Sequence, residues 1–210
     1  MSFADLLAFA LVTALLVMSP GPNGVLIART VPTSGPAAGF ANIGGFVAAF
    51  FVHGTLAIFG ISVILLHSAN AFTAVKMLGA AYLCFIGVKA LVAAWRGEAD
   101  AARVAPARRR RTLVAAFGEG FMTNALNPKV SMFYLAAFPQ FIPTGGHAAA
   151  WAFALVAVHA AINICWFSAM ILLFSRLTRA ARSGAFRRWL KGVTGVVFIG
   201  FGIRLATYRP

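Results

Sequence analysis

Two short polar segments interrupt long apolar stretches of this 210-residue chain: "SPGPNG" at residues 19–24 and "NALNPKVSMF" at residues 124–133. Proline removes a backbone donor and clashes with the preceding turn, so each segment should break a helix. A helix that restarts after such a break presents free N–H groups and the positive end of its dipole, which suit a carboxylate. Unwound carbonyls and asparagine side chains can accept from an ammonium group. The two segments therefore predict a pocket for a zwitterion such as an amino acid, or for another small polar solute.

The predicted binding residues come from both breaks. Lys129 brings a charge that is expensive inside an apolar layer, so it should face a cavity or a partner. A proline kink repaired by neighbouring side chains is the simpler interpretation, but Pro-Gly-Pro followed by Asn, matched by Asn-Pro-Lys, favours a binding role. The predicted set comprises Pro20, Gly21, Pro22, Asn23, Asn124, Asn127, Pro128 and Lys129.

The elements that must position these residues are membrane helices. The chain is 61% hydrophobic and 10% charged, with a mean hydropathy of +0.87, whereas soluble domains carry about 25% charged residues. Stretches of about 20 apolar residues can cross a bilayer. Six such spans are predicted, at about 4–29, 39–66, 71–95, 113–142, 148–174 and 190–207. We therefore expect an all-α, multi-pass membrane protein in one integral domain.

The basic residues lie mainly between the predicted spans. The formal net charge is +14, from 18 Lys and Arg against 4 acids, which in a soluble protein would suggest nucleic acid. Here the arginines gather at 96–111 and 175–191, and Lys and Arg in short loops mark the cytoplasmic side of a membrane. The prediction is therefore that these loops are cytoplasmic, that both termini are periplasmic and that the chain binds no nucleic acid.

The two halves of the chain resemble each other at uncommon residues. Identical residues recur 106 positions apart, as Pro22 and Pro128 and as His53 and His159, and the polar residues Asn23 and Lys129 share this offset. After one longer loop the offset becomes 115, as for Lys76 and Lys191 and for Gly87 and Gly202. Each half holds three spans, so the second must enter the membrane from the opposite side. The predicted architecture is two inverted three-helix repeats, about 1–95 and 113–210, joined by a basic loop at 96–112. Inverted repeats with broken first and fourth helices are typical of secondary transporters.

Three further residues are candidates for coupling transport to an ion gradient. His53 and His159 occupy matching places in the second and fifth spans, and histidine changes charge near neutral pH, as proton coupling requires. A hydrogen-bonded pair between helices explains them equally well. Glu119 lies about two helical turns before Asn127. It could pair with Lys129, relay protons or lie at the cytoplasmic interface, and the interfacial position is favoured.

Neither a metal site nor a cofactor is expected. The two cysteines, Cys84 and Cys165, stand alone in different spans, without CxxC or metal-ligand spacing. Both are interpreted as packing residues, because a free cysteine behaves as a small hydrophobe.

Four segments together carry a family resemblance: "PGPNG" (20–24), "GAAYLCFIG" (79–87), "NALNPKVSMFYLAAFPQFIP" (124–143) and "GVVFIGFGIRLA" (195–206). They resemble the LysE/RhtB family of bacterial amino acid exporters over nearly the whole chain. The resemblance implies a transporter, not an enzyme, that exports amino acids across the inner membrane and is driven by an ion gradient, with protons the expected coupling ion. Some members carry an acid in the second span, but residues 39–66 have none, so a neutral substrate such as homoserine, threonine or leucine is expected.

Two other functions remain as alternatives. A membrane thiol–disulfide conductor of DsbD-like type needs two thiols that can approach each other, but the cysteines are 81 positions apart, outside the repeat register, and neither break contains one. A metal-cation exporter needs clustered carboxylates, imidazoles or thiolates, and only 4 acids are present.

Overall fold

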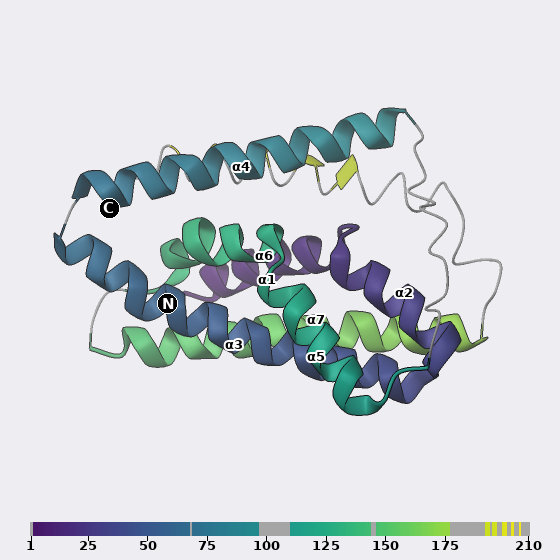
Figure 1. Cartoon of the computed structure of the whole chain (residues 1–210). Coiled ribbons are helices and arrows are strands. Elements are labelled where there is room, and N and C mark those ends of the chain that lie inside the picture. The colour runs from purple at the N-terminus through teal and green to yellow at the C-terminus, as the bar shows by residue number, and fades with distance from the viewer. Residues whose placement is uncertain are drawn as a thin grey trace.

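The computed structural model describes residues 2–67, 69–96, 110–143 and 146–176, together with scattered positions from 192 to 206. Every regular element in this part of the chain is helical (Figure 1). The elements are α1 (Phe3–Met18), α2 (Pro22–Ser34), α3 (Pro36–His67), α4 (Ala69–Trp95), α5 (Leu113–Ala125), α6 (Pro128–Met132), the π-helix η1 (Phe133–Ala137), the 3-10 helix η2 (Phe138–Phe141) and α7 (Ala148–Arg176).

The first predicted break is confirmed. Helix α1 begins with a capping box, in which Ser2 and Asp5 each accept from the other's backbone N–H. It ends at Met18 because Ser19 is extended and two prolines follow. The chain restarts at Pro22, the first residue of α2, and the two helices are bent by 52°. The first apolar stretch is thus one bent pair of helices rather than a straight span.

The second predicted break is also confirmed, and it is longer. Helix α5 ends at Ala125, and α6 starts at Pro128 after Asn127 has capped it by accepting from the backbone N–H of Lys129. The chain then continues as η1 and η2. Short π-helices are rare and often lie at functional sites. From Leu126 to Phe141 the chain is therefore regular α-helix only over the five residues of α6.

Helices α3 and α7 are long and apolar enough to cross a bilayer, and the bent pair α1–α2 makes a third candidate if it is one span. Large apolar side chains on these helices, such as Leu56, Phe59 and Leu172, are exposed, as expected for surfaces that contact lipid. Described helices lie at the positions of the first five predicted spans, and three of these positions, those of α1–α2, α3 and α7, hold candidate membrane spans. The sixth, 190–207, lies mostly outside the described residues, so the six-span inverted repeat is taken up below as a proposal.

Helix α3 is the centre of the packing, with its most extensive contacts to α5 and α7. It runs in the opposite direction to α7, while α4 lies along one side of the molecule (Figure 1). Helices α3 and α5 touch backbone to backbone: a Cβ at Gly45 would collide with the backbone of Phe117 and Phe121, and one at Gly120 with that of Asn42. This close crossing brings the second break against the middle of α3.

Candidate functional site

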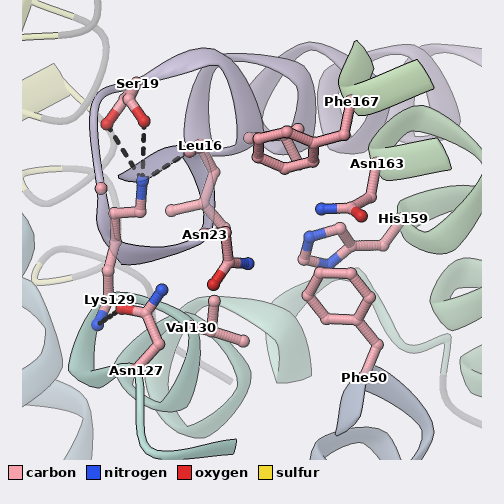
Figure 2. Close-up of a pocket in the computed structure, with 13 residues that line it drawn as sticks. Leu16, Ser19, Asn23, Phe50, Asn127, Lys129, Val130, His159, Asn163 and Phe167 are labelled. Carbon is pink, nitrogen blue, oxygen red and sulfur yellow. Dashed lines mark hydrogen bonds between the residues drawn. The ribbon is translucent and has the colours of Figure 1, made fainter. Parts of the chain in front are cut away.

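The two breaks meet at one cavity, drawn in Figure 2. It has room for about 20 Å³, enough for about one water molecule, so it must widen before a larger solute can enter. Its wall combines polar groups from the breaks with side chains of α3 and α7. The lining residues are Leu16, Val17, Ser19, Gly21, Asn23, Gly24, Phe50, Asn127, Lys129, Val130, His159, Asn163 and Phe167.

The ammonium group of Lys129 is held by the end of α1. Its Nζ donates to the carbonyl oxygens of Leu16 at 2.9 Å and Ser19 at 3.1 Å, and to the Ser19 hydroxyl at 3.2 Å. These carbonyls are among those that α1 leaves without helical partners at its C-terminus, where the dipole favours a cation. The positive charge at the second break is thus stabilised by the first break.

The first break makes the reciprocal contact. Asn23, in the first turn of α2, donates from Nδ2 to Oδ1 of Asn124 in the last turn of α5, at 2.9 Å. Asn124 in turn donates to the Phe46 carbonyl of α3 at 2.8 Å. Each restarting helix therefore reaches across to the end of the helix that precedes the other break.

The two restarting helices, α2 and α6, differ in how their N-termini are capped. Asn127 caps α6 with its side chain, whereas the N-cap of α2 is Gly21, which offers no side-chain hydrogen bond. The first backbone N–H groups of a helix have no internal partner. Gly21, Asn23 and Gly24 all line the cavity. The start of α2 is therefore open to an anion, and Lys129 lies beside it, since its Nζ would be 3.0 Å from a Cβ at Gly21.

Three buried polar atoms at the cavity have no hydrogen-bond partner among the described residues. They are Oδ1 of Asn23, Nε2 of His159 and Oδ1 of Asn163. The residues are 7%, 0% and 1% exposed. Buried polar groups are nearly always paired, so these three atoms leave hydrogen-bonding capacity at the cavity that a water or another bound molecule can use. Figure 2 shows His159 and Asn163 reaching from α7 toward Asn23, with Lys129 on the opposite side.

An aromatic cluster fixes the orientation of His159. Its ring lies 4.0 Å from that of Phe50 between centroids, and its Nδ1 is 3.2 Å from the hydroxyl of Tyr134. Tyr134 stacks in turn on His53, with centroids 5.6 Å apart. The Nε2 of His53 donates to the carbonyl of Asn124 at 3.3 Å. The two histidines are therefore connected through Tyr134.

The structure brings together some of the sequence-predicted residues and leaves others aside. Gly21, Asn23, Asn127, Lys129 and His159 line the cavity, while Asn124 is buried directly behind Asn23. The remaining predicted residues do not line it: Pro20, Pro22 and Pro128 are exposed at the breaks, His53 is half-buried behind Tyr134, and Glu119 pairs with Arg111 at 2.7 Å.

Sequence reasoning did not select Asn163, Ser19, Tyr134 or Phe50. Asn163 had a usable signal, since it is a polar residue in an apolar span and follows His159 by four positions, on the same helix face. Ser19 is the first residue of the segment at 19–24. Nothing in the local sequence marks Phe50 or Tyr134, whose roles follow from helix crossings.

Neither cysteine belongs to the site. Cys84 is half-buried on α4, Cys165 is exposed on α7, and both are free. Within the described residues no group of three His, Cys, Asp or Glu side chains is placed to hold a metal ion.

Comparisons with known proteins agree on one family. The family model described as LysE type translocator matches residues 14–209. The chain is 28% identical to the threonine efflux protein of Escherichia coli strain K12, over 97% of this chain and 98% of that one. It is 30% identical to the leucine efflux protein of Klebsiella pneumoniae, over 92% and 91% respectively. An uncharacterized membrane protein of Bacillus subtilis is 30% identical over 95% of this chain and 97% of its own length. No solved structure matches the chain.

Proposed function

Since the chain belongs to the LysE type translocator family, a family of transporters and not of enzymes, we propose that this multi-pass membrane protein exports a neutral amino acid across the inner membrane. Two of its relatives are named for threonine and for leucine efflux. The observation that carries the proposal is the cavity between the two helix breaks, which offers one partner for each end of a zwitterion.

The carboxylate end is matched by positive groups on one side of the cavity. The ammonium of Lys129 lies beside the uncapped start of α2, whose first N–H groups have no helical partner. A helix N-terminus together with a cation attracts a carboxylate. All three hydrogens of the ammonium are engaged, two by backbone carbonyls and one by the Ser19 hydroxyl. The hydroxyl is the partner that can rotate away when a carboxylate binds.

The ammonium end is matched by Oδ1 of Asn23. The Nδ2 of Asn23 already donates to Asn124, while Oδ1 of this cavity-lining residue has no partner among the described residues. The lining includes no acid within the described residues, and Lys129 would repel a second positive charge. The site therefore favours a neutral side chain over a cationic one.

The proposed architecture is six spans in two inverted repeats, about 1–95 and 113–210. The reciprocal contacts between the breaks support it, because Asn23 and Lys129 occupy matching repeat positions and each reaches the helix end before the other break. We also propose that the basic loop at 96–112 is cytoplasmic and both termini periplasmic. Reporter fusions at the two ends test this, and a cytoplasmic C-terminus would exclude it.

Protons are the proposed coupling ion, and His159 is the strongest candidate to carry them. It is the coupling candidate that lines the cavity, and through Tyr134 it connects to His53. Glu119 is a weaker candidate, because it pairs with Arg111 and does not line the cavity. A thiol–disulfide conductor or a metal exporter is not favoured, since neither cysteine lines the cavity and the family is one of translocators.

The direct test is efflux from cells loaded with a panel of amino acids, measured with and without an uncoupler. We expect faster efflux of at least one neutral amino acid in cells that make the protein, and we expect the uncoupler to remove the difference. Basic amino acids serve as the matched comparison and should leave at the background rate. If no amino acid leaves faster than from control cells, the proposed function is wrong.

A further inference from the structure

The face that α7 turns toward the cavity has hydrogen-bonding capacity that the protein itself does not use. His159 and Asn163 are one helical turn apart on this face. Nε2 of His159 and Oδ1 of Asn163 are buried and have no partner in the described part of the chain. A bound molecule that leaves such an atom unpaired loses about 5- to 100-fold in affinity for each one. These two atoms therefore select among ligands.

Under the proposed function, the two charged ends of the substrate have partners elsewhere. Lys129 and the start of α2 suit the carboxylate, and Asn23 suits the ammonium. The polar pair on α7 lies across the cavity from Lys129 (Figure 2). It is left to meet the amino acid side chain.

A hydroxyl group matches this pair when Nε2 of His159 carries the ring proton and Nδ1 accepts from the Tyr134 hydroxyl. A hydroxyl has one hydrogen to donate and can accept two hydrogen bonds, so it can donate to Oδ1 of Asn163 and accept from the Nε2–H of His159. The cavity has room for about one water, and a hydroxyl reproduces the hydrogen bonds of such a water. A methyl group in the same place cannot, and displacing an ordered water without replacing its bonds loses affinity.

The residues around His159 and Asn163 strengthen the discrimination between a hydroxyl and a methyl group. Phe50 packs against the His159 ring at 4.0 Å between centroids, and Phe167 lines the cavity one turn beyond Asn163. Aromatic walls exclude bulk water, and hydrogen bonds gain strength in a low-dielectric site. Tyr134 holds the other ring nitrogen of His159, so the ring cannot turn away from the cavity without losing that bond.

We propose that His159 and Asn163 form a specificity subsite that hydrogen-bonds a side-chain hydroxyl of the exported amino acid. This inference rests on the proposed function. It separates substrates of the same shape: threonine is selected over valine, which carries a methyl in place of the hydroxyl.

The test compares export of threonine and valine, each loaded to the same internal concentration. The wild-type protein is expected to prefer threonine by about 10- to 100-fold in the ratio of efflux rate to half-saturation concentration. Asn163→Leu should reduce threonine export far more than valine export and bring the ratio toward one. Thr13→Val is the matched control, because the Thr13 hydroxyl is also buried and unpaired but does not line the cavity; its ratio should equal that of the wild type.

Each outcome has one meaning. Equal export of threonine and valine by the wild type overturns the subsite and leaves the proposed function standing. Export of no amino acid removes both. An Asn163→Leu protein that reaches the membrane in normal amount but loses threonine and valine export equally shows that Asn163 does not discriminate between the two side chains, which also overturns the subsite. If Asn163→Leu does not accumulate, the smaller change Asn163→Ala is measured against the same two ratios.

Discussion

Replacing Lys129 by methionine tests the site most directly. Methionine has a similar length and no charge, so it fills the space of the lysine stem while removing the ammonium. The Leu16 and Ser19 carbonyls then lose a donor that lies at 2.9 and 3.1 Å. The cavity keeps its uncapped α2 terminus but has no cation beside it. We expect export to fall to the background rate.

The size of the effect follows from the charge. Two unit charges about 4 Å apart attract by about 4 kcal/mol at an effective dielectric constant of about 20. Since every 1.4 kcal/mol is about tenfold in affinity, losing the ammonium weakens carboxylate binding by about 1,000-fold. Substrate at ordinary cellular concentrations would then leave the site almost empty.

The assay is amino acid efflux together with the amount of protein in the membrane. The amount should stay close to that of the wild type, because membrane insertion depends on the apolar spans. Lys89→Met is the matched control, since Lys89 is exposed on α4 and does not line the cavity; its efflux should be unchanged. Lys129→Arg retains the charge but not the fit to the three oxygens, so it should keep part of the activity. Normal efflux by Lys129→Met would refute the carboxylate role.

Three further changes test other parts of the structure. Gly45→Val should lower the free energy of unfolding by about 1–3 kcal/mol or more, because its Cβ meets the backbone of α5. Membrane abundance and thermal stability measure this, and Gly60→Ala, at a position with open space, is the control. Ser19→Ala should lower the half-saturation concentration for export by about 2- to 10-fold, since it frees one hydrogen of the lysine ammonium; a raised value would contradict this. His53→Gln keeps a donor for the carbonyl that His53 contacts, but glutamine cannot titrate, so the pH profile of efflux should change. A profile identical to that of the wild type would mean that His53 has only a packing role.

Local residue chemistry was sufficient to predict the two breaks. Proline is tolerated in the first turn of a helix but not in its interior without cost, and α1 and α5 end, and α2 and α6 begin, beside Pro20, Pro22 and Pro128 as expected. Long apolar stretches likewise predict α3, α4 and α7 nearly to their bounds. Both kinds of signal depend only on residues that are neighbours in the chain.

The choice among candidate residues required the fold. The prolines that make the breaks are exposed, while Asn163, which no break contains, is buried at the cavity with an oxygen that has no partner among the described residues. The partner of Lys129 is more than a hundred positions away, as is that of Asn23. Such contacts depend on how closely α3 and α5 cross and on how the bent helices meet.

The sequence thus determines where the helices break, which charges must avoid lipid, and the family to which the chain belongs. The tertiary structure alone decides that one break stabilises the cation of the other, that α2 starts uncapped while α6 is capped, and that α7 supplies the remaining polar groups. The physical reason is the separation along the chain of the residues that interact. Helix formation and termination depend on residues a few positions apart, whereas the hydrogen bonds and burial at the site depend on which surfaces the packed helices bring together.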